Sequence, residues 1–359
     1  MIIPPIDPPT QFTRVQSPAG LFQFPCDTAY FADMLHGIRS HDDQRMVSAE
    51  YLSIPDGIVI VGDREIFYVT ADWKYIPNLY PKSWPYAKHL AADGRSLSLD
   101  LECLPKHRLH GTFFMPFNVA GNWFHMLFDN YARLYHLGCL HADIALSIGI
   151  PFWGYPDAIA ACSDRAMIHS LFLEGLQTER LEKGVYQIDR VIAPPLGNAA
   201  DYIFAEPARF VSKKLQEGLV SRQFTHQQRI FVSRADIPVR NIVNEADLAA
   251  ELQRLGFIIL CPGDYSLRCQ FELFASADII VGVHGQGLIP MICARKCRAL
   301  MEFEAAGWSY TTYSSIAEIM GMSYHKLPCE MLEYRNPGRF DWLAKVDVGK
   351  CVAMIERAL

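Results

Sequence analysis

Two segments of this 359-residue chain carry residue types at spacings that can do chemistry. The first, GNWFHMLFDNYARLYHLG (121–138), holds polar residues at offsets 0, 3, 7, 11 and 14, which share one narrow face of an α-helix at ~100° per residue. Those residues are Asn122, His125, Asp129, Arg133 and His136. The second, VGVHGQGLIP (281–290), places two glycines directly after an apolar run. Each segment predicts a different kind of site.

The polar face of 121–138 must meet something polar, because the rest of the helix is apolar and is expected to be buried nearly all round. His125 has an ordinary pKa of ~6.5, so it can remove a proton from a hydroxyl group. Asp129 is the other candidate for the base, or it orients the imidazole. A buried structural network in which Asp129 pairs with Arg133 is the alternative. His125 and Asp129 also suit two metal ligands, but the sequence offers no convincing third.

The turn at 281–290 has the features of an anion site. A buried strand ends at His284, and Gly285 and Gly287 allow the backbone to approach a ligand closely. The helix predicted to follow offers unpaired N–H groups and the positive end of its dipole. We therefore expect Gly285, Gln286, Gly287 and Leu288 to bind a diphosphate. A tight turn without a ligand is the alternative.

Charged residues follow two other predicted strands at the same edge of the sheet. Arg234 closes RIFVSR and Arg240 lies in the next loop, where guanidinium groups can bind phosphate oxygens bidentately. Glu302 and Glu304 end RALMEFE, where a carboxylate can accept hydrogen bonds from both hydroxyls of a ribose. We expect one of the two glutamates to do so. Solvation is the alternative for all four residues.

The elements that must position these residues alternate between strand and helix. A hairpin is predicted over 58–70, across Gly62-Asp63. The predicted strands are 113–119, 142–150, 186–195, 229–234, 257–262, 278–284, 298–304 and 322–328. The predicted helices are 121–138, 157–176, 206–220, 244–256, 266–277, 285–294, 310–321 and a final helix from about 341. Such alternation favours parallel sheets covered on both faces, an α/β fold.

At ~100–200 residues per domain, the chain length predicts two domains. A polar stretch near 205–228 marks the boundary. We assign 1–205 to an N-terminal domain, within which 1–110 gives no clear pattern, and 225–330 to a C-terminal domain. Residues 331–359 are expected to form a tail and helix that pack back on the N-terminal domain.

Bulk composition excludes several classes of protein. The net charge of −6 and the lack of a Lys/Arg-rich run argue against nucleic-acid binding. Ten scattered cysteines without a CxxC pair are typical of reduced thiols, so neither a disulfide framework nor a zinc site is expected. No signal peptide or membrane span is recognisable. We expect a cytoplasmic protein, with attachment to the inner face of a membrane left open.

Several of these motifs, in this order, resemble glycosyltransferase family 61, whose members include capsular-polysaccharide, plant xylan and O-linked-glycan enzymes. The resemblance covers about 113–304. It rests on the aromatic-His segment with His125 and Asp129, on Ser233-Arg234, Arg240, Asn244-Glu245, Gln270, His284-Gly285-Gln286-Gly287-Leu288 and Glu302. Two features depart from the family pattern: Gln286 replaces an Ala, and Ile289-Pro290 replace Thr-Asn.

The resemblance implies a GT-B arrangement, with two Rossmann-like domains facing a cleft, the acceptor domain first and the donor domain second. It implies an inverting transfer of a hexose or pentose from a nucleotide sugar, first of all a UDP-sugar, to a glycan or polysaccharide acceptor. Arg234, Arg240 and the helix dipole would neutralise the leaving diphosphate, so no metal cofactor is expected. The alternatives are a non-catalytic nucleotide-binding or scaffold protein in polysaccharide assembly, and a metal-dependent hydrolase using His125 and Asp129.

Overall fold

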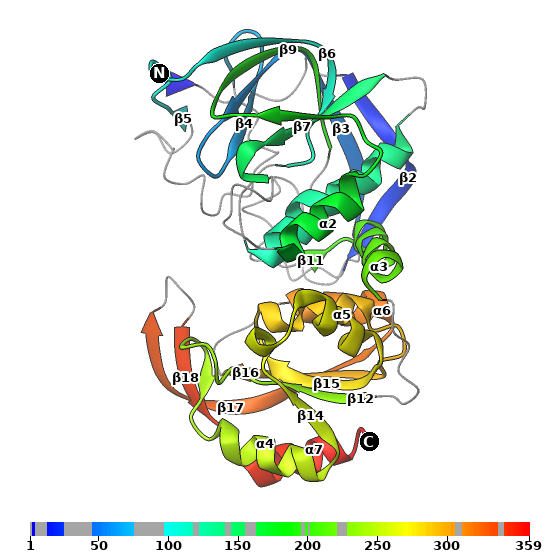
Figure 1. Cartoon of the computed structure of the whole chain (residues 1–359), viewed down its shortest axis with the longest axis vertical. Coiled ribbons are helices and arrows are strands. Elements are labelled where there is room, and N and C mark those ends of the chain that lie inside the picture. Colours follow the sequence, from blue (N-terminus) through cyan, green and yellow to red (C-terminus); the bar gives the residue numbers. More distant parts are fainter. Residues whose placement is uncertain are drawn as a thin grey trace. The chain divides into compact units, whose positions relative to one another are not determined.

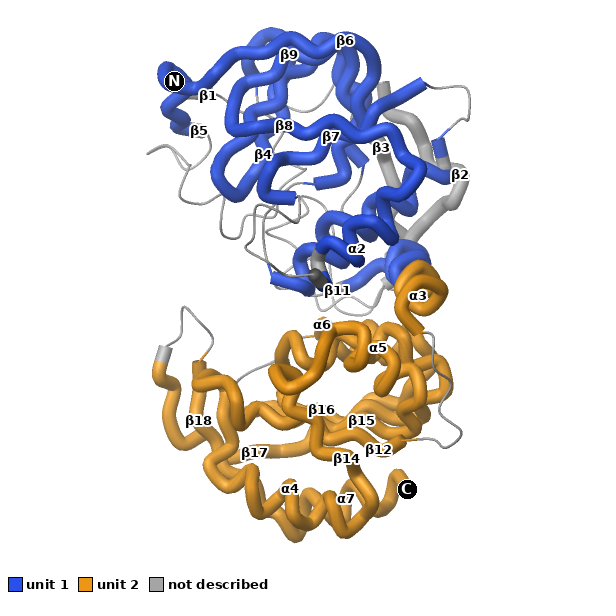
Figure 2. The backbone as a smooth tube through the Cα atoms, in the orientation of Figure 1, with its two compact units in different colours: residues 1–211 blue, residues 212–359 orange. Residues whose placement is uncertain are grey.

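A computed structural model gives the fold. It describes residues 2–3, 13–24, 45–74, 97–117, 122–140, 145–154, 163–194, 198–199, 202–220, 228–305, 311–336 and 341–359. The chain forms two compact units, residues 1–211 and 212–359 (Figure 2). Within the described ranges, no helix is long and apolar enough to cross a membrane.

Unit 1 is built on a seven-stranded mixed sheet in the order β2-β3-β9-β6-β7-β8, with β4 beside β3. The strands are β2 (Thr13–Phe24), β3 (Arg45–Val61), β4 (Ile66–Val69), β6 (Lys106–Phe114), β7 (Leu146–Pro151), β8 (Thr178–Leu181) and β9 (Gly184–Ala193). β9, β6, β7 and β8 are parallel neighbours, whereas β2 and β4 each pair antiparallel with β3. The predicted hairpin is confirmed, because Val61 pairs with Ile66 across the turn.

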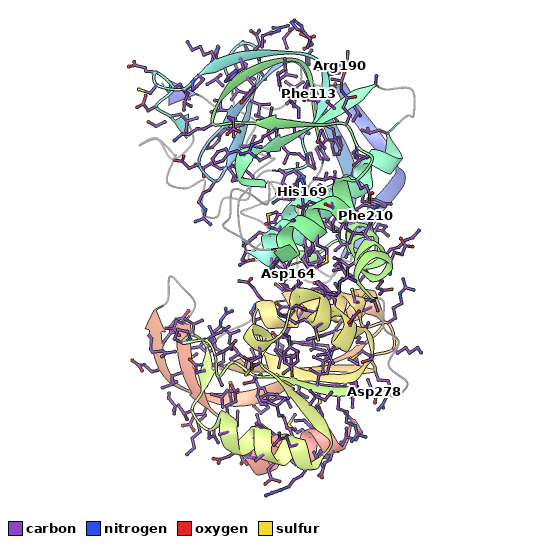
Figure 3. The ribbon with its side chains drawn as sticks, in the orientation of Figure 1. Phe113, Asp164, His169, Arg190, Phe210 and Asp278 are labelled. Atoms are coloured by element: carbon purple, nitrogen blue, oxygen red, sulfur yellow. The ribbon has the colours of Figure 1, made fainter. Side chains whose placement is uncertain are left out.

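Short pairs and helices complete unit 1. β1 (Ile2–Ile3) pairs with β5 (Leu97–Ser98), and β10 (Asn198–Ala199) pairs with β11 (Tyr202–Ile203). Helix α2 (Ser163–Leu173) and the first part of α3 (Ala205–Leu219) bring aromatic rings together, with Phe172 and Phe210 5.9 Å apart between ring centroids. Figure 3 labels Phe210 and the nearby His169, whose Nδ1 lies 3.2 Å from the Tyr131 hydroxyl.

Unit 2 is a twisted sheet in the order β13-β18-β17-β16-β15-β12-β14. The strands are β12 (Gln228–Val232), β13 (Asn241–Ile242), β14 (Phe257–Leu260), β15 (Ala277–Val283), β16 (Ala299–Ala305), β17 (Ser323–Asn336) and β18 (Asp341–Lys345). β14, β12, β15, β16 and β17 are all parallel, and β18 runs antiparallel to β17. β12 comes first in the chain but lies between β14 and β15. The chain therefore moves from β12 to β14 on one side, and then to β15 on the other side of β12.

Helices cover both faces of this sheet (Figure 1). α4 (Glu245–Arg254) and α7 (Val348–Glu356) pack on one face, where Leu248, Leu252 and Ile355 join the buried core. α5 (Leu267–Ala275), the 3-10 helix η8 (Gln286–Cys293) and α6 (Thr312–Met320) lie on the other face. The predicted layering of helices on both sides of a parallel sheet is confirmed for this unit.

The C-terminal segment differs from the prediction. Residues 341–345 form strand β18 instead of the start of a helix, and the helix α7 begins only at Val348. Trp342 and Ala344, two positions apart, are both fully buried, which is the alternation of a strand. The segment predicted to be a tail therefore supplies a strand and a helix to unit 2.

Candidate functional site

The first candidate group lies at the point in unit 2 where the strand order reverses. In a doubly wound sheet, ligands bind beyond the carboxyl ends of the two strands that flank such a point. Here those strands are β12, which leads into Ser233 and Arg234, and β15, which leads into His284 and Gly285. Topology therefore brings together two segments that the sequence predicted to bind a diphosphate.

Arg234 and Gly285 are in close contact. A Cβ atom added to Gly285 would lie 2.1 Å from Nη1 of Arg234, so the guanidinium occupies the space that a side chain would need. The φ of Gly285 is 164°, an extended conformation open to any residue. Glycine is therefore required here by the approach of the arginine, not by backbone strain.

The loop after β12 holds Arg234 in place. The Arg234 side chain is 5% exposed, and its Nε and Nη2 donate to the Val239 carbonyl at 3.2 and 3.1 Å. Glu245, at the start of α4, accepts hydrogen bonds from the Ser233 hydroxyl and from the Arg234 backbone N–H. Glu245 of the Asn-Glu motif thus stabilises the loop that carries the arginine, whereas the Asn244 side chain bonds the backbone of Val346.

Two positive charges act on each other in this loop. Burial, and after it the charge of Arg240, lower the pKa of Arg234 to about 10, which leaves Arg234 cationic at neutral pH. Arg240 has a φ of +57°, in the left-handed region that side chains other than glycine seldom adopt. Such strain often marks functional positions. A buried cation with a second, partly exposed cation acting on it is stabilised by a bound anion.

His284 contacts the buried carboxylate of Glu302. Its Nδ1 lies 2.7 Å from Glu302 Oε1, and the Tyr324 hydroxyl donates to Glu302 Oε2, also at 2.7 Å. The Tyr313 hydroxyl donates to the Gly285 carbonyl, and the rings of His284 and Tyr313 are 4.9 Å apart. Burial raises the pKa of both tyrosines, so their hydroxyls remain protonated donors.

Other predicted donor residues have different surroundings. Leu288 is fully buried, and its N–H donates to the Gly285 carbonyl at 3.0 Å, so it stabilises the turn and the core instead of facing a ligand. Gln286 is exposed. Gly287 packs closely, since an added Cβ would lie 2.9 Å from Val232 Cγ1. Glu304 pairs with Lys326 at 2.6 Å.

The second candidate group lies in unit 1, in the segment predicted to be one helix. His125–Asn130 instead form a π-helix and Tyr131–Cys139 a 3-10 helix. The two windings differ from 3.6 residues per turn, so the predicted single polar face is wrong. His125 and Asp129 remain at the surface, whereas Arg133 and His136 are completely buried.

His125 and Asp129 form a hydrogen-bonded pair. Nδ1 of His125 lies 2.5 Å from Asp129 Oδ2, and the His125 side chain is 42% exposed. Burial by itself would lower the pKa of His125, but the hydrogen bond and negative charge of Asp129 outweigh it and raise the pKa above its ordinary 6.5. With Nδ1 held by the carboxylate, Nε2 is the nitrogen available to exchange a proton.

Arg133 and His136 lie in the protein interior instead. The guanidinium of Arg133 donates to the carbonyls of Pro116, at 2.9 Å, and Pro194, at 2.6 Å. It thereby joins the chain that leaves β6 to the chain that leaves β9. Burial and the charge of Arg133 lower the pKa of His136 to about 3, so this imidazole is neutral.

Two residues with clear contacts were not predicted: Tyr313 and Tyr324. Glu245 was named only as part of the family motif, without a role. The tyrosines had no local signal, because a tyrosine near the start of a helix or strand is ordinary. In the part of the chain that the structure describes, no three His, Cys, Asp or Glu side chains are grouped to hold a metal ion.

Residues 123–301, which include His125, Asp129, Arg234, Arg240 and His284 but end just before Glu302, match the family model described as Glycosyltransferase 61. The chain belongs to glycosyltransferase family 61. It is therefore a glycosyltransferase enzyme, and this part of the prediction is confirmed. No curated protein matches the sequence.

Two solved structures show a weak likeness to this glycosyltransferase. One is the iron-containing dodecameric glycosyltransferase TibC from enterotoxigenic E. coli H10407, at 10% identity and a TM-score of 0.27. The other is the heptosyltransferase TibC with ADP-D-β-D-heptose, at 12% identity and the same TM-score. Each match covers 71% of this chain and 75% of the other. A TM-score this low carries no argument about fold or substrate.

Proposed function

We propose that this glycosyltransferase moves a sugar with inversion from a nucleoside-diphosphate sugar, with UDP as the first candidate nucleotide, to a hydroxyl of a glycan or polysaccharide. The observation that carries the proposal is the buried guanidinium of Arg234, seated over Gly285 at the reversal of the strand order with Arg240 beside it. Two partly desolvated cations at that position match the charge of a diphosphate.

The chemistry needs a base and a stabilised leaving group. His125 Nε2 removes the proton from the acceptor hydroxyl, and Asp129 holds the ring through Nδ1. The acceptor oxygen then forms a bond to the anomeric carbon as the bond from that carbon to the diphosphate oxygen breaks. The nucleoside diphosphate leaves with the bonding electron pair, and Arg234 and Arg240 stabilise its charge. Because these side chains supply the positive charge, we propose that donor binding needs no divalent metal.

The proposal also assigns a role to each unit. Unit 2 is the donor-binding domain and unit 1 carries the base, in keeping with the GT-B arrangement that the sequence predicts. Both Rossmann-like character and the order of the two roles stay predictions, as does the identity of the sugar acceptor.

Calorimetric titration of the full chain with UDP, GDP and CMP and their common sugar conjugates, each with and without Mg²⁺, tests the donor site. We expect one diphosphate nucleotide to bind in chelator, with at least tenfold weaker binding in Arg234→Ala. Arg254→Ala is the matched control, because that arginine is exposed on α4 and pairs only locally with Glu251. Binding that needs metal, or equal losses in both variants, would contradict the proposal.

A further inference from the structure

Glu302 is a poor candidate for the ribose ligand that the sequence suggested. Its carboxylate is 2% exposed, and its two oxygens already accept hydrogen bonds, one from His284 and one from Tyr324. A carboxylate oxygen can accept more than one hydrogen bond, but a group this buried leaves little surface for a ribose hydroxyl to reach. The position of Glu302 therefore suits a residue that acts on another side chain.

Its partner His284 lies where a ligand is expected. His284 directly follows β15 and precedes Gly285, over which the Arg234 guanidinium lies. Because Nδ1 faces Glu302, the opposite side of the ring presents Nε2 away from the carboxylate. The charges of Glu302, Arg240 and Arg234 all act on the hydroxyl of Tyr313, whose ring contacts His284. The carboxylate and the arginine pair thus belong to one electrostatic environment.

Strand register explains how Tyr324 reaches this carboxylate. On the parallel strands β16 and β17, Leu300 pairs with Tyr324 and Glu302 pairs with Lys326. Alternate residues share one face of a sheet, so Tyr324, Lys326, Glu302 and Glu304 all point to the side covered by α6. Met301 and Phe303 point to the opposite side, into the core under α4 and α7. The polar layer is thus confined to one face.

We infer that Glu302 and Tyr324 are positioning residues: Tyr324 fixes the Glu302 carboxylate, and Glu302 fixes the His284 imidazole so that it contacts the diphosphate of the donor. This inference rests on the proposed function, and it moves Glu302 from the ribose to the phosphate side of the site. The hydroxyls of the ribose are then bound by other residues.

Inorganic pyrophosphate separates the two roles, because it carries the diphosphate charge without a ribose. Glu302→Gln keeps the size of the side chain but loses its charge. We expect it to weaken the binding of UDP and of pyrophosphate by the same factor, about tenfold. Tyr324→Phe should weaken both ligands by an equal, smaller factor. Tyr334→Phe and Glu330→Gln are the matched controls, since both residues are exposed on the same strand, β17.

Coupling between residues supplies the second test. If Glu302 acts through His284, the double variant His284→Ala/Glu302→Gln should bind UDP no more weakly than His284→Ala alone. In addition, Glu302→Gln should lower the affinity for 2′-deoxy-UDP by the same factor as the affinity for UDP. Thermal unfolding checks that each variant is folded, and Tyr324→Phe, a single-oxygen deletion, keeps the test available if Glu302→Gln does not fold.

The outcomes separate this inference from the proposed function. Unchanged pyrophosphate binding together with weaker UDP binding in Glu302→Gln would show that the carboxylate binds the ribose. That result would overturn the inference but leave the proposed function intact. If the wild-type chain binds neither pyrophosphate nor any of the nucleotides, the proposed donor site is wrong, and the inference fails with it.

Discussion

The guanidinium of Arg234 fills the space beside Gly285 that any other side chain would occupy. An added Cβ would lie 2.1 Å from Nη1 and 3.2 Å from Cζ of Arg234, far inside van der Waals contact. The glycine that the sequence associated with a tight turn is thus needed to seat a charge. The two residues come from different strands, and the parallel pairing of β12 with β15 sets their proximity.

Gly285→Ala should therefore weaken donor binding with little effect on stability. The clash is with the flexible end of a side chain, so we expect Arg234 to move and nucleotide affinity to fall at least tenfold. The free energy of unfolding should change by only about 1 kcal/mol. Calorimetry and chemical denaturation measure the two effects. Gly138→Ala is the control, because an added Cβ there meets nothing within 4 Å. A large loss of stability with unchanged affinity would contradict this interpretation.

The pH dependence of turnover should depend on Asp129. His125 must be unprotonated to act as a base, so kcat/KM should fall on the acid side as its raised pKa is passed. In Asp129→Asn this acid limb should move to lower pH, because burial and the charge of Arg64, which lower the pKa, then act without the carboxylate. Turnover should also fall, since the ring loses its orientation. An acid limb that stays in place in Asp129→Asn would contradict the assignment of His125.

The raised pKa of His125 also makes the free energy of unfolding depend on pH. A raised pKa means that the folded state binds the proton more tightly than the unfolded state does. The stabilising contribution of the pair is therefore fully present below the ordinary pKa of 6.5 and is lost as the pH rises through the raised value. Comparison of unfolding free energies of wild type and His125→Gln across this range measures it.

Replacement of Arg133 should destabilise unit 1. Arg133→Met keeps much of the volume but leaves the carbonyls of Pro116 and Pro194 without their donor, which should cost roughly 2–4 kcal/mol. Denaturant unfolding followed by fluorescence measures the change. Arg209→Met is the control, since that side chain is 59% exposed on α3. Equal shifts for the two variants would show that the buried hydrogen bonds contribute little.

Thiol labelling should separate exposed from buried cysteines. Burial raises the pKa of Cys297 and Cys329 to about 12 and that of Cys351 to about 11, so these thiols should react only on unfolding. Among the cysteines whose exposure the structure describes, Cys103 is exposed and should react first. Peptide mapping after brief alkylation identifies the labelled positions, with Cys103→Ser as control. Rapid labelling of Cys351 in the folded protein would contradict the burial of α7.

Sequence patterns predicted the parallel strands β12, β14, β15 and β16 of unit 2 well, because each is a short apolar run between segments with recognisable ends. Ser266 forms one such end, since its side chain accepts a hydrogen bond from the Cys269 N–H at the start of α5. The pattern failed at 121–138, where the winding depends on partners far along the chain, such as the carbonyl of Pro194 held by Arg133. Residues 341–345 were wrongly predicted to be helical because the three consecutive apolar residues 342–344 hide the alternating burial of the strand.

The candidate site was predicted in outline. Apolar strands ending in Arg234 and His284 were evident, and the parallel sheet brings those ends together. The contact of Arg234 with Gly285 was not predictable, since it depends on one side-chain conformation. The sequence also could not predict which of Glu302 and Glu304 belongs to the site. The two lie on the same face of the strand, and only their cross-strand neighbours distinguish them.

The strand order of unit 2 also has a consequence for synthesis of the chain. Of the strands in this sheet, the central strand β12 is made first, but one face of the sheet is completed by Trp342 in β18 and Ile355 in α7, which are made more than 100 residues later. At ~5–20 residues per second, the interval is on the order of ten seconds. During that time the apolar strands β12, β14 and β15 exist without their final cover. The nascent unit 2 is thus expected to bind chaperones that recognise exposed apolar strands.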